Sequence, residues 1–482
     1  MKVQLINPPR FNKTPVIREV RCAGLSPVSV FPPLNLAYIA SFLRERGIDI
    51  SLIDANALDL SWNDVEDSIR KFKPDVIIFK SSPPTMIWDC NTAKIAKKIN
   101  KKIITILDDS HIAPVFPEKT LKKFPYIDLL IRGESEKTSF QLIKTIKGKR
   151  NFNKVTGISF RKGNKIVNTK PTPPIKNLDD LPIPAFDLLP INKYFSITFS
   201  KRKPFMTIIT SRGCPFRCDF CIVGGSTVWR GSGNGWFQRS AKSILDEIEH
   251  LVKNYKIKDI YFFDETFTVD KKRVLEICKG IKKRNIKINW SCNSRVDSVQ
   301  DEKMLKTMAE AGCWNLLFGV ESGSQEILDS CNKRINISQI KKTFEITKKY
   351  GIYASSSFMV GLPGETKETI RKTLKLALEL NPDFSQFVIT TPYPGTILYE
   401  KVKKEGLLER DYKFSSYDAY CVQDHPVLRT EFMSSEEIAR AQKWLYKKFY
   451  FRLSYILHRL FSIKNFNELK YHLKAMKYVA GV

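Results

Sequence analysis

Three cysteines lie close together in the stretch SRGCPFRCDFC, residues 211–221. Cys214 is followed by Cys218 after three intervening residues, and Cys218 by Cys221 after two. A structural zinc site takes four ligands, and a thioredoxin-type redox site takes two cysteines. A 4Fe-4S cluster is usually held by four cysteines, so three would leave one iron open to a substrate or cofactor. The spacing therefore favours an iron–sulfur cluster with one open iron.

The residues between these cysteines argue against an incidental grouping. Structural cysteines are usually buried among apolar neighbours, whereas the intervening positions here include Pro215, Arg217 and Asp219. The stretch also follows a strand candidate, FMTIITS at 205–211. In a parallel barrel, chemistry takes place where strands end. We therefore expect these cysteines to have a chemical role.

Composition indicates where such a site would work. The chain has 482 residues, 43% of them hydrophobic, and ten scattered cysteines. Its N-terminal stretch lacks the apolar core of a signal peptide, and no stretch reaches the ~18 apolar residues that span a bilayer. We therefore expect a cytoplasmic protein. In that reducing compartment, clustered cysteines bind metals or do redox chemistry. The net charge of +30 fits either an anionic partner or a solvated, lysine-rich surface.

The first part of the chain alternates short apolar runs with helical patterns. Residues 1–148 contain five runs rich in Ile, Val and Leu, as expected of strands buried on both faces. Gly47 and Ser61 fit the end of one helix and the start of the next. The alternation predicts a doubly wound, Rossmann-like α/β domain, which binds ligands at the carboxyl ends of its parallel strands. The runs are 3–7, 49–55, 75–82, 102–109 and 127–134.

A connecting region separates this domain from a second alternation. Over 149–200 the sequence predicts a hairpin that turns at Gly163-Asn164, and then a proline-rich extended linker. Over 201–400, six β–α units predict a partial (β/α)6 barrel like that of TIM. The remaining residues, 401–482, predict a helical region with a capping box from Ser434 to Glu437. The barrel strand candidates are 205–211, 259–265, 288–294, 315–322, 353–361 and 384–390.

The cysteine spacing, with an aromatic residue before the last cysteine, resembles the signature of the radical SAM superfamily. The resemblance implies that Cys214, Cys218 and Cys221 hold a 4Fe-4S cluster, and that Phe220 lies near the adenine of S-adenosylmethionine (SAM). In that family the open iron chelates SAM. One electron, from a flavodoxin or ferredoxin, then cleaves SAM to methionine and a 5′-deoxyadenosyl radical. The radical abstracts hydrogen from an unactivated carbon.

Downstream stretches continue the resemblance over about 200–400. They imply that Asp264 and Glu265 accept the SAM amino group and that Arg295 binds its carboxylate. Glu321 and Ser322 are implied near the ribose or the methionine. The matching stretches are FFDETFTVD (262–270), SCNSRVDSV (291–299), GVESGS (319–324), VGLPGET (360–366) and TPYPGT (391–396).

A doubly wound domain ahead of such a barrel resembles the cobalamin-binding radical SAM subfamily. Its members include methyltransferases of unactivated carbons, and cyclases of hopanoid, bacteriochlorophyll and natural-product pathways. The resemblance spans nearly the whole chain and implies cobalamin as a third cofactor. Matching stretches include LINPP (5–9), PPLNLAYIASFLRERG (32–47), IDAN (53–56), KPDVI (73–77), IRGESEKT (131–138) and KKFYFRLSYILHRL (447–460).

One turn departs from the subfamily pattern. Relatives carry Gly-Gly-Pro-His after the fourth strand, where glycine lets the backbone approach the corrinoid. This chain has Asp108-Asp109-Ser110-His111. His111 is either a residue on the cobalt side or a surface histidine at a turn. After the third strand, Ser81, Ser82 and Thr85 are either hydroxyl partners of the corrin or helix caps.

The C-terminal stretch 434–461 has an apolar stripe at helical spacing, with basic residues largely on other faces. We expect the stripe to pack on the barrel. Contact with an anionic membrane at its inner face is a secondary interpretation, and would suit a lipid or isoprenoid substrate. The stripe comprises Leu445, Phe449, Leu453, Ile456, Leu457 and Leu460.

Together these features favour a cobalamin-dependent radical SAM C-methyltransferase acting on a small-molecule substrate. The alternative keeps the radical step but ends in cyclisation or C–C bond formation without methyl transfer. An RNA-modifying radical enzyme would suit the positive charge. The family that such enzymes resemble has three further cluster cysteines in its N-terminal domain. Here residues 1–200 hold only Cys22 and Cys90, so nucleic acid is disfavoured. A non-catalytic corrinoid-binding protein is disfavoured by the intact cysteine triad.

Overall fold

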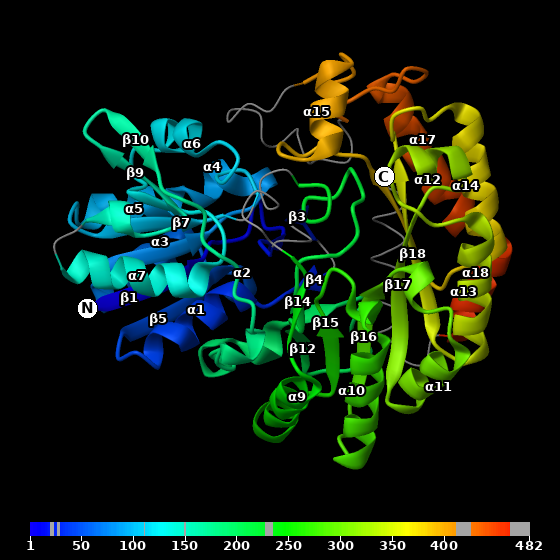
Figure 1. Ribbon diagram of the computed structural model, residues 1–482, viewed down its shortest axis with the longest axis horizontal. Coiled ribbons are helices and arrows are strands. Elements are labelled where there is room, and N and C mark those ends of the chain that lie inside the picture. The colour runs from blue at the N-terminus through cyan, green and yellow to red at the C-terminus, as the bar shows by residue number, and fades with distance from the viewer. Residues whose placement is uncertain are drawn as a thin grey trace.

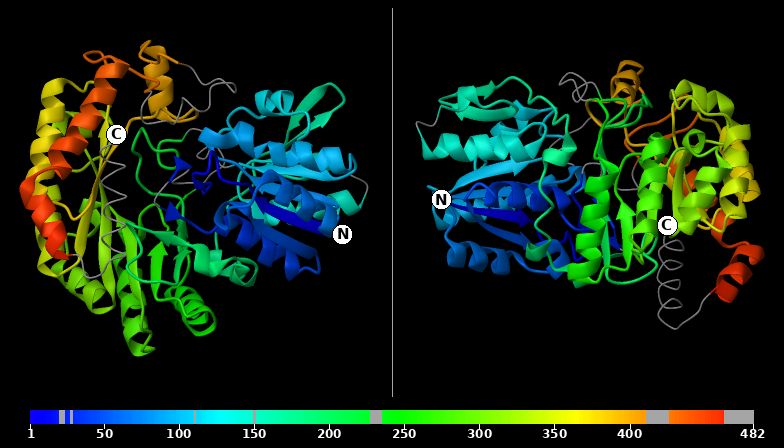
Figure 2. Two further views of the ribbon diagram at one scale, coloured as in Figure 1. Left: turned by 180° about the vertical axis from the view of Figure 1, so that it is seen from behind. Right: turned by 60° about the horizontal axis from the view of Figure 1, so that its bottom comes forward.

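The computed structural model describes two α/β units that lie side by side (Figure 1). Figure 2 shows the same two units from behind and from below. The described residues are 1–19, 24–26, 29–109, 111–148, 151–226, 235–410 and 426–462. Cys22 and Ser110 lie outside them.

The N-terminal unit is built on a seven-stranded sheet of order β10-β9-β8-β7-β6-β1-β5. Its first five strands in the chain are parallel to one another, and every residue of β6 is buried. Continuous apolar runs produce this arrangement because helices cover both faces. The doubly wound fold predicted from the sequence is therefore confirmed. The strands are β1 (Lys2–Asn7), β5 (Asp49–Asp54), β6 (Val76–Lys80), β7 (Ile104–Asp108), β8 (Leu129–Ile131), β9 (Ile158–Lys162) and β10 (Lys165–Asn168).

Amphipathic helices cover this sheet. Helix α1 packs against α7, and α3 packs against α5. Ser61 caps α3, as predicted, and the structure adds a capping box with Asp64. The helices are α1 (Leu34–Arg44), α2 (Ala55–Leu58), α3 (Trp62–Phe72), α4 (Met86–Asp89), α5 (Asn91–Ile99), α6 (Pro117–Lys123) and α7 (Ser135–Lys147).

The predicted hairpin is part of this sheet. Strand β9 pairs antiparallel with β8, so the sheet continues beyond residue 148 to Asn168. The proline-rich stretch that follows lies against the N-terminal unit, where the Tyr194 hydroxyl donates to Asp54 (2.8 Å). Strand β11 (Phe195–Ser196) pairs with β4 (Ser29–Val30). The stretch is thus a fixed connector, because its side chains and short strand are bonded to the first unit.

The second unit contains six parallel strands in the order β12-β15-β16-β17-β18-β19. Consecutive neighbours in space are consecutive β–α units, so the predicted partial (β/α)6 barrel is confirmed. Its strands are β12 (Phe205–Ile208), β15 (Asp259–Phe262), β16 (Asn289–Ser294), β17 (Cys313–Glu321), β18 (Tyr353–Val360) and β19 (Ser385–Ile389). Its helices are α9 (Ala241–Tyr255), α10 (Lys271–Lys283), α11 (Glu302–Glu310), α12 (Gln325–Ser330), α13 (Ile337–Lys349), α14 (Lys367–Leu380) and α15 (Ile397–Lys404).

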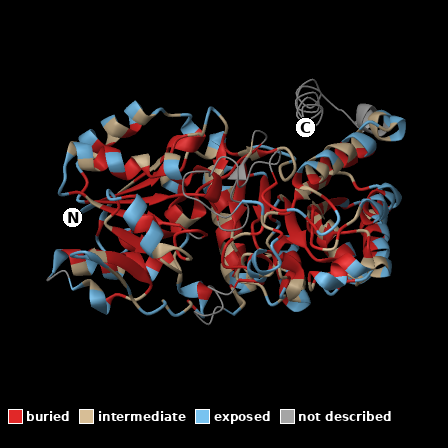
Figure 3. Ribbon diagram, turned by 90° about the horizontal axis from the view of Figure 1, so that it is seen from above, coloured by how far each residue is buried: buried red, intermediate tan, exposed pale blue. Residues whose placement is uncertain are grey.

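Phe31, from the N-terminal unit, packs into the barrel. Its ring centroid lies 5.6 Å from that of Phe263, 6.0 Å from Tyr261 and 6.2 Å from Phe205. Phe31 is buried and belongs to one apolar cluster that includes residues of both units. Figure 3 shows buried residues running through the middle of the molecule. The hydrophobic core is therefore continuous across the junction.

Two short strand pairs complete the fold. They are β2 (Val16–Ile17) with β3 (Gly24–Leu25), and β13 (Ser211–Arg212) with β14 (Phe237–Gln238).

The C-terminal helical stretch divides into two helices. Helix α17 (Ser435–Tyr450) begins with the predicted capping box and packs on β19 and α14. Leu445 and Phe449 are buried there, as expected of a stripe packed on the barrel. The predicted single helix breaks after Tyr450, and α18 (Leu453–Ser462) leaves Leu453 71% exposed. Within the described ranges, we find no helix with the length and hydropathy of a membrane span.

Candidate active site

The three cysteines of the predicted cluster line one cavity of about 310 Å³. Cys218 is buried, and Cys214 and Cys221 are partly exposed. Burial raises the pKa of the Cys214 thiol to about 11 and raises that of Cys218 as well. In the described part of the chain, no three Cys, His, Asp or Glu side chains gather closely enough to hold a single metal ion. The three thiols line one cavity together, as expected of ligands to an iron–sulfur cluster.

Backbone contacts fix the cysteine loop at the end of the first barrel strand. The Cys221 N–H donates to the Cys218 carbonyl (3.1 Å), and the Gly224 N–H points at the Cys221 sulfur (3.4 Å). Gly213 has a φ of 82°, and a Cβ there would lie 2.1 Å from the carbonyl oxygen of Gly235. Only glycine is accommodated at that approach.

Asp264 holds the residues that lead into the cysteine loop and is not part of the cavity lining. Its buried carboxylate accepts hydrogen bonds from the N–H groups of Thr210 (2.6 Å) and Ser211 (3.2 Å) and from the Ser211 hydroxyl (2.8 Å). The structure therefore does not bring this side chain to the cavity, where the sequence placed it. Its neighbour Glu265 does line the cavity.

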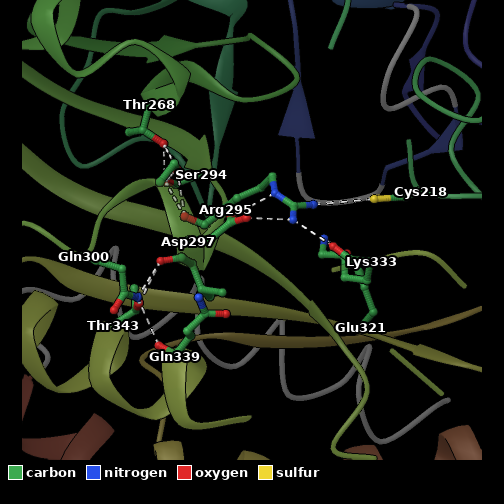
Figure 4. Close-up of polar contacts among 12 residues, drawn as sticks. Cys218, Thr268, Ser294, Arg295, Asp297, Gln300, Glu321, Lys333, Gln339 and Thr343 are labelled. Atoms are coloured by element: carbon green, nitrogen blue, oxygen red, sulfur yellow. Dashed lines mark hydrogen bonds and ion pairs between the residues drawn. The ribbon is translucent and has the colours of Figure 1, made fainter. Parts of the chain in front are cut away.

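Arg295 lies at the centre of a polar network beside the cysteines (Figure 4). Its Nη1 donates to the Cys218 sulfur (3.5 Å), and its Nε and Nη2 donate to the two carboxylate oxygens of Asp297 (2.9 and 3.0 Å). The Nη2 also donates to the Lys333 carbonyl (2.8 Å), and the guanidinium lies 3.9 Å from the Phe216 ring centroid. The arginine is buried. Its orientation is thus fixed on several sides.

A second charged pair, Glu321 and Lys333, lines the same cavity. The Lys333 ammonium donates to Glu321 Oε1 (2.6 Å), and both side chains are buried. Glu321 has a φ of 65°, at a register shift between β17 and β18. Ser322, by contrast, lies outside the cavity lining, with its hydroxyl 3.4 Å from that of Thr373.

Lys333 was not found by the sequence analysis. It follows helix α12 rather than a strand end, so no βα-loop position points to it. A buried lysine needs a partner. The partner here, Glu321, lies at the end of β17, and no local pattern joins the two residues. Phe220, which the sequence did single out, lines the cavity and packs against a small apolar cluster that includes Leu362.

His111 brings the N-terminal unit to this cavity. Its ring lines the same space as the cysteines, 6.3 Å from the Tyr393 ring. Asp109 holds the residues that follow His111, since its Oδ2 accepts from the N–H groups of Ile112 (2.8 Å) and Ala113 (2.7 Å). Asp108 pairs with the buried Lys80 (3.3 Å). Asp108 and one oxygen of Asp109 therefore have protein partners.

The carboxyl edge of the N-terminal sheet carries buried polar atoms without protein partners. Asp109 Oδ1, Ser81 Oγ and Glu19 Oε1 have none among the described residues. Burial raises the pKa of Glu19 to about 8. Because such atoms are costly to leave unbonded, this edge fits a polar ligand such as the amide-bearing corrin ring. These carboxyl and hydroxyl groups are compatible with the amide groups of cobalamin.

Ser82 and Thr85 lie in a network beneath this edge. Their hydroxyls are 2.7 Å apart, and that of Thr85 donates to Asp89 (2.7 Å). Asp89 forms a buried ion pair with Arg18 (2.7 Å). Both hydroxyls are thus held by protein groups, whereas that of Ser81 is not.

An ion pair joins the two units next to the cysteine loop. Arg212, two residues before Cys214, contacts Glu136 (2.5 Å) and Glu134 (3.6 Å) at the start of α7. These carboxylates raise the pKa of the Arg212 guanidinium. The position of the loop is thereby tied to the N-terminal unit.

Comparison with known proteins agrees with this architecture. The model of the radical SAM superfamily matches residues 208–377, and that of the B12 binding domain matches 20–143. The chain is 36% identical to an uncharacterized methyltransferase of Pyrococcus horikoshii, over 97% of this chain and 96% of the relative. It is 32% identical to the anaerobic magnesium-protoporphyrin IX monomethyl ester cyclase of Rubrivivax gelatinosus, over 88% of this chain and 75% of the relative.

A solved structure shares the fold of both units. The cobalamin-dependent SAM radical enzyme OxsB, with aqua-cobalamin and SAM bound, matches with a TM-score of 0.77 at 19% identity. The match covers 99% of this chain and 71% of that one. The two sheets and the cysteine-lined cavity define a radical SAM enzyme with an added corrinoid-binding domain.

The chain belongs to the cobalamin-binding radical SAM family, which includes methyltransferases and cyclases. Its cofactors are a 4Fe-4S cluster, SAM and cobalamin, as the sequence predicted. Enzymes of this kind act on a small-molecule substrate and need a one-electron reductant.

Proposed function

We propose that this protein is a C-methyltransferase whose reaction takes place in the cavity shared by the cysteine loop and His111. One observation carries the proposal: a residue of the B12-type domain and three cysteines of the barrel line the same space. When bound, the cluster with SAM supplies a hydrogen-abstracting radical, and cobalamin supplies a methyl group. A substrate in this space would be within reach of both.

The charged residues of the cavity suit the two ends of an amino acid. Glu265 and Glu321 offer carboxylates to the SAM ammonium, and Arg295 and Lys333 offer cations to its carboxylate. Cys214, Cys218 and Cys221 are the proposed cluster ligands. Phe220 offers an apolar face to the adenine. Asp264 has a supporting role, because it bonds the strand end that leads into the cysteine loop.

On the corrinoid side, His111 is proposed to face the cobalt, and Ser81 to donate to the corrin or its tail. Asp109 Oδ1 and Glu19 are further polar groups at this edge. Ser82 and Thr85 are proposed to act by ordering the loop after β6, since Asp89 already holds them.

Anaerobic purification with cobalamin, followed by iron and cobalt quantitation, tests the cofactor assignment. We expect about four irons and one cobalt per chain. Cys218→Ala should lose most of the iron, whereas Cys278→Ala, at a buried helix position outside the cavity, should keep it. Full iron content in Cys218→Ala would reject the proposed ligand set.

Product mass separates methyl transfer from the cyclase alternative, which the relationship to the Rubrivivax enzyme supports. A methylated product gains the mass of one CH2. A product formed by cyclisation gains none, and that result would favour the alternative.

We further propose that helix α18 contacts an anionic membrane from its exposed apolar side, which would suit a lipid substrate. Leu453 is 71% exposed and Leu457 is 43% exposed. Neighbouring exposed apolar side chains often mark a contact surface.

Flotation with phosphatidylglycerol vesicles tests this contact. We expect wild-type protein to float with the vesicles, and Leu453→Ser/Leu457→Ser to remain below. The matched control is Leu58→Ser/Ile87→Ser, since these two apolar side chains are also exposed but belong to the N-terminal unit. Equal flotation of all three proteins would contradict the proposal.

A further inference from the structure

Arg295 contacts the sulfur of a proposed cluster ligand directly. The distance from its Nη1 to the Cys218 sulfur is 3.5 Å, within the range of an N–H···S hydrogen bond. Both side chains are buried, so little solvent screens the interaction. The positive charge of Arg295 therefore acts on Cys218 at short range.

The guanidinium has little freedom to turn away from the sulfur. Asp297 receives two hydrogen bonds from its opposite edge, and the Lys333 carbonyl receives a third (Figure 4). Two-pronged contacts of this kind fix the plane of an arginine. Phe216 lies against the guanidinium at 3.9 Å. The hydrogen bond to Cys218 is thus enforced by the surroundings.

Such a contact changes the energy of cluster reduction. Reduction adds one negative charge to a cluster that thiolates already make negative. Hydrogen bonds to cluster sulfurs and nearby cations stabilise the more negative state and raise the reduction potential. Lys333 also acts on Cys218 by its charge, although Glu321 at 2.6 Å compensates part of it; what Arg295 adds is a direct hydrogen bond to the sulfur.

We propose that Arg295 sets the reduction potential of the 4Fe-4S cluster through its hydrogen bond to Cys218, with Asp297 as its positioning residue. The proposal rests on the assignment of Cys218 as a cluster ligand. It adds to the role of Arg295 toward the SAM carboxylate, because it concerns the cluster before SAM is bound. Asp297 also opposes the effect, since its negative charge lies beside the guanidinium.

A redox titration of the full-length, anaerobically reconstituted protein tests the proposal. The electron paramagnetic resonance signal of the reduced cluster is followed against solution potential, without SAM. Arg295→Met should lower the midpoint potential, because it removes both the charge and the hydrogen bond. Arg295→Lys should give an intermediate value, since the charge remains but the planar fork is lost.

Asp297→Asn should shift the potential in the opposite direction. Asparagine keeps one of the two oxygen acceptors of the guanidinium and removes the negative charge. The matched control is Lys341→Met. Lys341 lies on the outer helix α13, and the substitution removes the cation from its exposed pair with Glu379 of α14. Its midpoint potential should equal that of the wild type.

The iron content of each variant is measured in parallel. Wild-type potentials in Arg295→Met and Arg295→Lys, at full iron content, would overturn the proposal. If Arg295→Met takes up too little iron to titrate, Arg295→Lys decides: a lowered potential supports the proposal and an unchanged one rejects it. An unshifted potential in Asp297→Asn would reject the role of Asp297, whereas a lowered one would show that its hold on the guanidinium outweighs its charge. Full iron in Cys218→Ala would instead reject the ligand assignment, so the two failures are distinguishable.

Discussion

The carboxylate of Glu365 is buried beside the end of β18. It accepts hydrogen bonds from the N–H groups of Gly361 (2.6 Å) and Leu362 (3.2 Å), and its Oε1 has no hydrogen-bond partner among the described residues. Burial outweighs these bonds and raises the pKa of Glu365 from 4.5 to about 7. The folded chain therefore holds this proton more tightly than the unfolded chain.

Glu365→Gln should remove a pH-dependent loss of stability. In the wild type, the contribution of the protonated group is fully present below pH 4.5 and is lost as pH rises toward 7. Linkage sets this loss at about 3 kcal/mol at most. Glutamine mimics the protonated side chain, so the variant should gain stability relative to wild type between pH 5 and pH 8. Urea denaturation at both pH values measures the gain.

Parallel pH profiles for the two proteins would contradict the expectation for Glu365. Glu19 and Asp259 also have raised pKa values, but both are present in the variant. Comparison of the two profiles therefore isolates Glu365.

At the residue scale, the sequence predicted side chains that stand in a spaced motif or at a strand end. Cys214, Cys218, Cys221, Arg295 and Glu321 all line the cavity. Motif position alone could not separate Asp264 from Glu265, because adjacent residues leaving a strand point in different directions. Lys333 and the contact of Arg295 with Cys218 depend on packing between distant segments, which leaves no local pattern.

At the scale of elements, the junction between β13 and α7 determines where the cysteine loop lies. Arg212 is mostly buried, and Glu136 is almost fully so. Breaking a buried ion pair leaves the remaining charge without compensation, which costs about 3–5 kcal/mol. Exposed pairs contribute about 0–1 kcal/mol.

Arg212→Met should therefore destabilise the protein by about 3 kcal/mol or more, and should loosen the cysteine loop. Thermal denaturation and iron retention after gel filtration measure the two effects. Arg44→Met is the matched control, since Arg44 also pairs with a carboxylate, Asp187, but is 46% exposed. Similar small losses in both variants would show that the junction contributes little.

Element type was predictable wherever the apolar period was clear, as in the parallel strands and the capped helices. The hairpin was predicted, but its addition to the sheet edge was not, because strand pairing depends on partners outside the local stretch. The stripe over 434–461 continues at helical spacing across the break after Tyr450. Periodicity alone therefore could not reveal that the chain changes direction there.

At the scale of the whole molecule, the order of the two units follows from the alternation of strands and helices and from the family resemblance. The way in which the two units meet cannot be predicted from either of these features. His111 approaches Tyr393, and Phe31 packs with Phe205 and Tyr261. These pairs are far apart in the chain, and each residue alone resembles an ordinary core or turn position.

The packing of Phe31 in the barrel has a consequence for biosynthesis. Strand β4 and Phe31 leave the ribosome long before β11, β12 and β15, which complete their surroundings. During that interval the nascent N-terminal unit exposes an aromatic side chain and an unpaired strand. Such surfaces are what holdase chaperones bind, so translation speed through the connector should influence how much of this enzyme reaches its native state.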